Sequence, residues 1–257
     1  MAISLFDLTG KVAVITGSTR GIGRAIAEAM ARAGAKVVIS SRKPDKCVEV
    51  AEAIKSEGCK ATPIACNIGK REDLERLVAE TRQCYGRIDI LVCNAAVNPY
   101  YGPMAQAPDE AFTKIIDSNV RSNLWLCNIV IPEMAERRDG SVIIVSSIGG
   151  LKGSSMLGIY GISKAADMQL ARNLAVEWGP RNVRVNCIAP GLVRTDFARA
   201  LWENPETLAR AESSYPLRRI GEPEEIAGMA VLLASRAGNW ITGQTFVIDG
   251  GATIAGG

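Results

Sequence analysis

Short apolar runs alternate with segments of helical length along almost the whole chain. Residues 11–16 read KVAVIT, residues 36–41 read KVVISS and residues 142–146 read VIIVS. These runs are nearly continuous rather than alternating with polar residues, as in strands that helices cover on both faces of a parallel sheet. The pattern therefore predicts an α/β fold, a single doubly wound (Rossmann) domain with a mostly parallel seven-stranded sheet.

The remaining elements follow the same alternation. Further strands are expected at residues 61–66, 88–93, 183–189 and 245–248, and helices at residues 20–33, from Pro44, and at residues 71–85, 109–136, 155–178 and 222–234. Residues 195–213 are the one long excursion, which we interpret as a small helical lid over a substrate. The chain shows no linker or internal repeat, so residues 1–257 are expected to form one domain.

The chain contains no histidine. This excludes a Ser-His-Asp or Cys-His nucleophile and a His-ligated metal. Any general acid or base must then be Asp, Glu, Lys, Tyr or Cys. The seven cysteines are odd in number and none stands at C-x-x-C spacing. They indicate free thiols in a reducing compartment, and neither a disulfide framework nor a metal site is expected.

The charges are nearly balanced, with 30 Lys plus Arg against 27 Asp plus Glu. Without a basic block, the chain is expected to bind neither nucleic acid nor a membrane surface. No apolar run reaches the roughly 18 residues that a membrane span needs. Residues 1–7 have no basic start and no sustained apolar stretch, so no signal peptide is expected. These features together predict a cytoplasmic protein.

A glycine-rich turn follows the first predicted strand and precedes a predicted helix. Its residues are Gly17, Ser18, Thr19, Arg20, Gly21, Ile22 and Gly23. In such a turn the glycines permit the reversal, the approach of a pyrophosphate and the close packing of the helix. Backbone N–H groups and the helix dipole then hold the phosphates. The turn therefore predicts a bound nucleotide.

The end of the second predicted strand distinguishes the two nicotinamide cofactors. A site for NAD carries Asp or Glu about 20 residues past the glycine turn, where the carboxylate binds the ribose 2′-hydroxyl. This chain has Ser41, Arg42 and Lys43 there and no carboxylate. A guanidinium and an ammonium suit a 2′-phosphate, and Arg20 is a further candidate phosphate ligand. We therefore expect NADP(H).

Tyr160 and Lys164 stand at positions i and i+4 of the predicted helix 155–178 and so share one face. The ammonium charge is expected to stabilise the phenolate and to lower the pKa of Tyr160 towards working pH. Tyr160 would then be an acid for a ketone and a base for an alcohol. Ser147 ends the fifth strand and would hydrogen-bond the substrate oxygen. Its neighbour Ser146 should point the opposite way.

These motifs resemble those of the short-chain dehydrogenase/reductase family, through the G-x-x-x-G-x-G turn and the spacing from Ser147 to Tyr160 and Lys164. The resemblance covers nearly the whole chain. It implies that Asn119 is a fourth catalytic residue, which holds a water that relays protons to Lys164. It also implies cofactor contacts from Asn67, Ile68, Asn94, Ala95, Tyr160, Lys164, Pro190, Gly191, Val193 and Thr195. Ala96 departs from the family pattern, which has glycine there.

The resemblance implies an NADP-dependent oxidoreductase that reduces a small ketone or aldehyde, with hydride from the nicotinamide and the proton from Tyr160. The Ser-Arg-Lys sequence is similar to that of dicarbonyl and tropinone-type reductases. Three alternatives stay open. One is a 3-oxoacyl-carrier-protein reductase, with Arg138 and Arg181 docking an acidic carrier. The others are a hydroxysteroid or sugar-alcohol dehydrogenase and a non-catalytic NADP-binding protein. Residues 243–251 resemble a family segment at subunit contacts, which implies a homotetramer.

Overall fold

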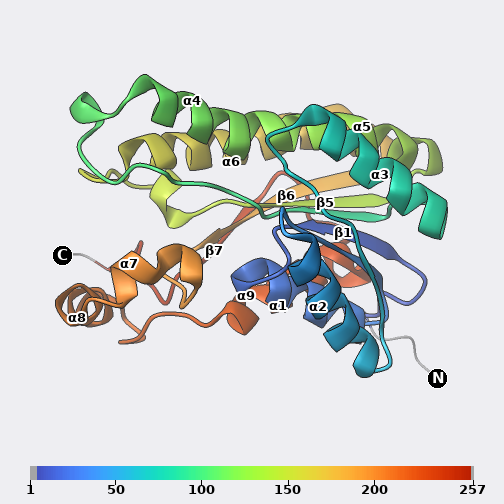
Figure 1. The fold of residues 1–257 in the computed structure, drawn as a ribbon, viewed down its shortest axis with the longest axis horizontal. Helices are drawn as coiled ribbons and strands as arrows, with labels where there is room; N and C mark the ends of the chain where they lie inside the picture. Colours follow the sequence, from blue (N-terminus) through green and yellow to red (C-terminus); the bar gives the residue numbers. More distant parts are fainter. Residues whose placement is uncertain (1–4, 256–257) are drawn as a thin grey trace.

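Seven parallel strands form one sheet in the computed structural model, which describes residues 5–255 (Figure 1). The strands are β1 (Val12–Thr16), β2 (Lys36–Ser40), β3 (Lys60–Pro63), β4 (Ile90–Cys93), β5 (Gly140–Val145), β6 (Val183–Pro190) and β7 (Thr245–Ile248). Their order is β3-β2-β1-β4-β5-β6-β7 and every neighbouring pair is parallel. This confirms the doubly wound sheet. The order reverses between β1 and β4, which is where such sheets bind ligands. The signal-peptide prediction rests on residues 1–7, and residues 1–4 lie outside the part of the chain that the structure describes.

Helices cover both faces of the sheet. They are α1 (Gly21–Arg32), α2 (Pro44–Ser56), α3 (Arg71–Tyr85), α4 (Asp109–Ile116), α5 (Ser122–Arg137), α6 (Gly158–Trp178), α7 (Arg199–Trp202), α8 (Pro205–Ser214) and α9 (Pro223–Ala234). Figure 1 shows α3, α4, α5 and α6 above the sheet and α1, α2 and α9 below it. None of the helices within residues 5–255 is long and apolar enough to cross a membrane.

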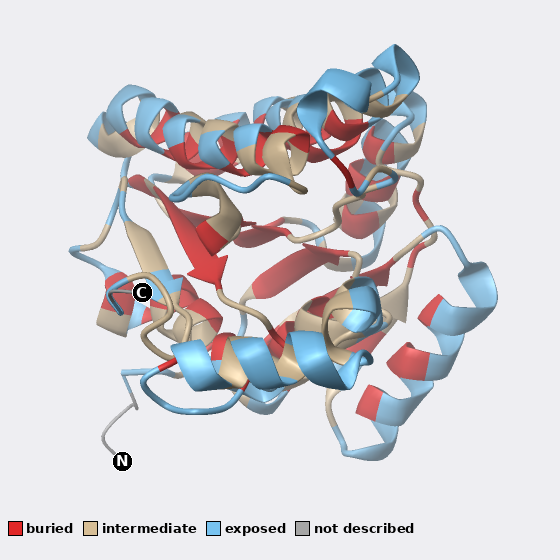
Figure 2. Ribbon diagram, turned by 90° about the vertical axis from the view of Figure 1, so that its left-hand side faces the viewer, coloured by how far each residue is buried: buried red, intermediate tan, exposed pale blue. Residues whose placement is uncertain are grey.

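The strands separate two apolar cores. Ala13 and Ile15 of β1 pack in the core that contains α1, α2 and α9, whereas Val14 packs in the core with α3, α5 and α6. Figure 2 shows the central strands buried and the outer faces of the helices exposed. Burial on both faces explains why the strands are continuous apolar runs in the sequence.

The helix expected over residues 109–136 differs from the prediction. It consists of α4 and α5 joined by a π-helical turn over Asp117–Arg121. Within and after this turn, side chains bond main-chain carbonyls. Ser122 Oγ donates to Ser118 O at 2.6 Å and Asn123 Nδ2 donates to Asn119 O at 2.6 Å. Such bonds compete with the regular helix ladder, and π turns are frequent at functional sites.

The excursion predicted at residues 195–213 is helical. It holds a short 3-10 turn over Asp196–Ala198, then α7 and α8. Trp202 Nε1 donates to Thr195 O at 2.8 Å, which ties α7 back to the end of the β6 loop. Asn204 caps α8 by accepting from Thr207 N at 3.0 Å.

Candidate active site

The glycine turn links β1 to α1 and adopts the tight conformation that its sequence predicts. Gly17 has φ +66°, in the left-handed region that favours glycine. A side chain at Gly23 would overlap the Gly17 carbonyl oxygen and the side-chain nitrogen of Asn94. Within the described residues, no side chain caps the N terminus of α1. The turn therefore offers a close, uncapped helix N terminus that fits the pyrophosphate of a dinucleotide.

Asn94, at the end of β4, holds the glycine turn in place. Its Nδ2 donates to Thr16 O at 2.9 Å and to Gly17 O at 3.2 Å. The backbone N–H groups of Asn94 and Ala95 donate to Thr16 Oγ1 at 3.0 and 3.1 Å. Two residues expected to bind cofactor thus lie directly beside the turn, and the Asn94 side chain supports its backbone.

Ser18 lies in the turn but points into the protein. Its hydroxyl donates to Ile15 O at 2.8 Å and accepts from Ser40 N at 2.8 Å, and the residue is fully buried. This side chain joins β1 to β2. Thr19 is half-buried beside it. The sequence of the glycine turn predicts both residues as cofactor contacts and does not distinguish the buried Ser18 side chain from the half-buried Thr19.

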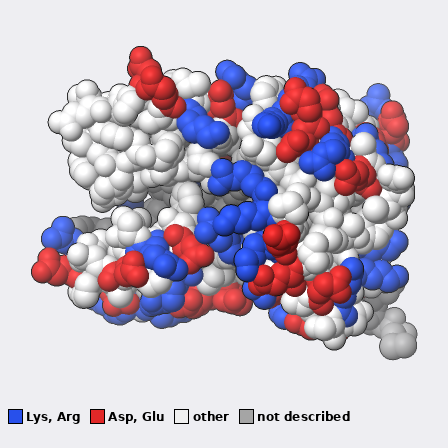
Figure 3. All heavy atoms as spheres, viewed as in Figure 1, with Lys and Arg blue, Asp and Glu red and all other residues white. Residues whose placement is uncertain are grey.

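The basic residues after β2 are unpaired. Arg42 and Lys43 are exposed, and in the described part of the chain neither has an acidic side chain within ion-pair distance. Ser41 is half-buried, with its hydroxyl 3.4 Å from the Cys47 thiol. Arg20 Nη1 lies 3.5 Å from Asp196 Oδ2. Figure 3 shows Lys and Arg side chains gathered beside a hollow in the surface.

The loops after β3 and β6 contribute the other expected cofactor residues. Asn67 Oδ1 accepts from Gly69 N at 3.1 Å, and Ile68 packs against the core. Pro190 ends β6, Gly191 N donates to Ile248 O at 2.9 Å, and Val193 pairs with Gly221. A Cβ on Gly21 would lie 3.0 Å from Thr195 Cγ2. The loop after β6 therefore reaches the glycine turn.

Ser147, Tyr160 and Lys164 come together at the carboxyl end of β5. The Ser147 hydroxyl accepts from Gly149 N at 3.0 Å and lies close enough to Tyr160 to lower the pKa of its phenol. Lys164 Nζ lies 5.8 Å from the centre of the Tyr160 ring. Ser146 points away, and its hydroxyl donates to Lys164 O at 2.7 Å. The two serines therefore face opposite ways, as strand geometry predicts.

The net shift of the Tyr160 pKa is opposite to the expectation from sequence. Burial raises it, Lys164 lowers it, Asp167 raises it and the hydrogen bond from Ser147 lowers it, and the sum lies above the ordinary value. The expectation considered Lys164 alone and left out the burial of the phenol. In the cofactor-free chain Tyr160 is therefore a protonated acid at neutral pH.

Asn119 is fully buried and does not contact Lys164. Its Oδ1 accepts from Val97 N at 2.8 Å, and its Nδ2 donates to Val97 O at 3.0 Å and to Ser163 Oγ at 3.1 Å. A connection from this turn to Lys164 runs through Asn123 and Asp167, which the sequence reasoning did not select. The sequence signal that could have identified Asp167 is its acidic side chain at position i+3 from Lys164.

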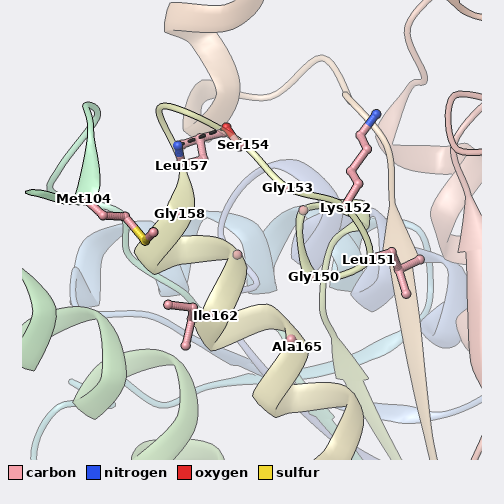
Figure 4. Close-up of a pocket in the computed structure, with 12 residues that line it drawn as sticks. Met104, Gly150, Leu151, Lys152, Gly153, Ser154, Leu157, Gly158, Ile162 and Ala165 are labelled. Carbon is pink, nitrogen blue, oxygen red and sulfur yellow. Dashed lines mark hydrogen bonds between the residues drawn. The ribbon is translucent and has the colours of Figure 1, made fainter. Parts of the chain in front are cut away.

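A cavity of about 390 Å³ has Gly149, a hydrogen-bond partner of Ser147, in its lining. A Cβ on Gly149 would lie 3.4 Å from Ser147 Oγ. The remaining lining is mostly glycine and aliphatic, and the named side chains in Figure 4 include Met104, Leu151 and Ile162. From the lid, the Phe197 ring lies 6.0 Å from the Tyr160 ring.

Comparison with known proteins agrees with this arrangement. Residues 17–253 match the family model described as enoyl-(acyl carrier protein) reductase. Dehydrogenase/reductase SDR family member 4 from Bos taurus is 46% identical over 245 residues, which cover 95% of this chain and 88% of the relative. The chain belongs to the short-chain dehydrogenase/reductase family. It is therefore an oxidoreductase by family, and members of this family bind NAD or NADP.

Solved members of the family bind different cofactors on the same fold. Gluconate 5-dehydrogenase from Burkholderia cenocepacia, in complex with NADP and tartrate, has a TM-score of 0.95 at 29% identity, and the match covers 100% of each chain. A 7α-hydroxysteroid dehydrogenase complexed with NADH and 7-oxo glycochenodeoxycholic acid has a TM-score of 0.93 at 35% identity, covering 96% of each chain. Fold similarity does not select the cofactor, so the choice must be argued from this chain's own residues.

Proposed function

We propose that this protein reduces a ketone or aldehyde to an alcohol with NADPH. The observation that carries the proposal is the contact of Ser147, Tyr160 and Lys164 at the carboxyl end of β5, on the same sheet edge as the glycine turn. The mostly apolar cavity that Gly149 lines, two residues after Ser147, favours a carbonyl compound with apolar substituents. The relatives named dehydrogenase/reductase support this class of reaction.

The roles of the side chains follow from their positions. Bound NADPH supplies the hydride. Ser147 hydrogen-bonds the carbonyl oxygen, and Tyr160 donates the proton as negative charge develops there. The Lys164 ammonium stabilises the phenolate that Tyr160 leaves behind. In the reverse direction the phenolate accepts the proton of an alcohol. Gly17, Gly21, Ile22 and Gly23 would hold the pyrophosphate, and Val193 and Thr195 the nicotinamide side.

The unpaired Arg42 and Lys43 support NADPH over NADH. A 2′-phosphate at the end of β2 would receive two positive charges that no carboxylate in the described part of the chain neutralises. Arg20 would add a third charge from the glycine turn, although it also lies 3.5 Å from Asp196 in the lid. A 2′-hydroxyl would find no acidic partner there.

Replacing Arg42 with Ala should raise the KM for NADPH by about 10- to 100-fold, because a charge-assisted hydrogen bond contributes roughly 1.5–3 kcal/mol. The KM for NADH should change little. Lys55→Ala is the matched control, since it removes one exposed positive charge at the far end of α2, the helix that follows Arg42 and Lys43. Initial rates with each cofactor check this result. An equal rise in the KM for NADPH and the KM for NADH would show that Arg42 does not bind the 2′-phosphate.

The raised pKa of Tyr160 keeps the phenol protonated at neutral pH, which is the form that carbonyl reduction needs. Because the phenol is protonated there, the rate of ketone reduction should stay level through neutral pH and fall on the alkaline side. Alcohol oxidation needs the phenolate, so its rate should rise with pH over the same interval. Rates of ketone reduction and of alcohol oxidation, each measured against pH, check these two directions of change. An oxidation rate that falls with rising pH would contradict Tyr160 as the titrating group.

The carrier-protein reductase is less well supported. Arg138 and Arg181 are exposed and adjacent in space, since Asn182 Nδ2 donates to Arg138 O at 2.7 Å. Both precede the amino ends of β5 and β6, however, whereas Ser147 lies at the carboxyl end of β5. A carrier docked there would be distant from Ser147 of the same chain. Slower turnover of an acetoacetyl thioester than of a simple ketone is the expected result.

We further infer a homotetramer in the cytoplasm. β7 is an edge strand on which Val247 is exposed, and the nearby Trp240 is fully exposed in the single chain. Large exposed apolar side chains of this kind mark protein interfaces.

All seven cysteines are free, which supports a reducing compartment.

A further inference from the structure

A buried carboxylate lies against the lysine of the catalytic cluster. Asp167 follows Lys164 by one turn of α6, and Lys164 Nζ lies 2.9 Å from Asp167 Oδ2. The side chains are 2% and 0% exposed. Lys164 Nζ also donates to Val145 O at 3.0 Å. Lys164 is therefore held from two sides, by the last residue of β5 and by its own helix.

The second oxygen of Asp167 connects to the π-helical turn. Asn123 Nδ2 donates to Asp167 Oδ1 at 2.9 Å and to Asn119 O at 2.6 Å. Both oxygens of the carboxylate are thus satisfied, one by an ammonium and one by an amide. The irregular turn over Asp117–Arg121 presents the Asn119 carbonyl to this amide. These contacts fix the position of Asp167 independently of Lys164.

The other titratable groups around the pair are one phenol and three thiols. They are Tyr160 on α6, Cys93 on β4, Cys127 on α5 and Cys187 on β6. The hydrogen bond with Cys127 and burial raise the pKa of Cys93, and burial raises the pKa of Cys187. Asp167 is therefore the one carboxylate in the described part of the chain that pairs with Lys164.

We propose that Asp167 is a positioning residue of the reaction, which holds Lys164 as a fixed ammonium ion beside Tyr160. A lysine this deeply buried tends to lose its proton, because a low-dielectric interior disfavours the charged form. Burial lowers the pKa of Lys164, whereas Asp167 raises it above the ordinary value. Burial raises the pKa of Asp167, and Lys164 and Asn123 oppose that rise. This inference rests on the proposed role of Tyr160 and Lys164.

Asp167→Asn tests the proposal through the pH profile of alcohol oxidation. Without the carboxylate, Lys164 becomes neutral and Tyr160 loses the cation that stabilises its phenolate. Lys164 acts on the Tyr160 pKa more strongly than Asp167 does, so the pKa of Tyr160 rises. We expect the acidic limb to move up by about one pH unit or more and kcat at neutral pH to fall at least about tenfold, with KM little changed.

Asp89→Asn is the matched control. Asp89 is also a buried carboxylate in an ion pair, with Arg87, but it precedes β4 at the opposite edge of the sheet. It should lower the melting temperature and leave the pH profile in place. An Asp167→Asn enzyme that melts earlier but keeps the wild-type profile would overturn the proposal. A limb that moves to lower pH would also overturn it, because Lys164 would then remain charged without Asp167.

If the Asp167→Asn protein does not fold, a measurement on the unaltered chain tests the proposal. With 15N-labelled lysine, a slowly exchanging ammonium signal that Lys164→Ala removes should persist into the alkaline range. Loss of that signal at neutral pH would overturn the proposal. This readout needs no turnover, so it separates failure of the ion pair from failure of the proposed reaction. An intact ammonium in a protein that reduces no carbonyl would count against the reaction alone.

Discussion

Replacing Tyr160 with Phe is expected to lower kcat for carbonyl reduction by about 10²- to 10⁴-fold, the usual contribution of a positioned general acid. The substitution removes one hydroxyl and keeps the ring that packs near Phe197. Among the described residues, no other acid hydrogen-bonds Ser147. Water would have to supply the proton in place of a positioned phenol. NADPH binding should be retained.

Tyr85→Phe is the matched control for this experiment. Tyr85 also carries a part-buried hydroxyl, which lies 2.6 Å from Thr62 Oγ1, at the end of α3 and outside the site. It should keep wild-type turnover. Steady-state rates and cofactor fluorescence of both variants give the comparison. If Tyr160→Phe turned over as fast as the parent chain, the protein would match the non-catalytic NADP-binding alternative.

Replacing Gly23 with Ala is expected to weaken NADPH binding by about tenfold or more. A methyl group there would overlap the Gly17 carbonyl and the Asn94 side chain, so the glycine turn must open. Overpacking of this kind costs about 1–3 kcal/mol. Part of that cost appears as lower stability and part as a turn that no longer fits the pyrophosphate.

Gly228→Ala separates the local clash from a general effect of added methyl groups. Gly228 lies inside α9 and nothing lies within 4 Å of the added Cβ. The free energy of unfolding of this variant should rise by about 0.5–1 kcal/mol, the usual difference between Gly and Ala inside a helix. Thermal melting and NADPH titration of both proteins are the measurements. Unchanged NADPH affinity in Gly23→Ala would argue against the glycine turn as the pyrophosphate site.

The sheet could be predicted from sequence because its signal is repeated in the five inner strands. These strands are buried on both faces, so each appears as a nearly continuous apolar run, whereas the edge strands β3 and β7 are partly exposed. Strand alternation predicts that Ser146 and Ser147 point opposite ways and the spacing to Tyr160 favours Ser147; the structure shows Ser146 bound to Lys164 O on the other side. These features depend on the conformation of a single element, which sequence periodicity reports directly.

The features that sequence did not predict depend on contacts between elements. The pKa of Tyr160 responds to burial and to Asp167 as well as to Lys164. The Ser18 side chain binds two strands because β2 lies beside the turn. The π turn at Asn119 requires the loop after β4 to offer the Val97 backbone. Ser40 and Val97 come from distant parts of the sequence, so spacing along one element carries no signal for them. Asp167 lies on the same helix as Tyr160, but its burial depends on the packing of other elements.

The most direct test of the account follows the hydride itself. NADPH with both hydrogens of nicotinamide C4 replaced by deuterium is incubated with the protein and a simple ketone, and the alcohol is analysed by mass spectrometry. Deuterium on the carbinol carbon is predicted, at a higher rate than from deuterated NADH. Unlabelled alcohol, no alcohol at all, or faster transfer from NADH would contradict the claim that this chain is an NADPH-dependent carbonyl reductase.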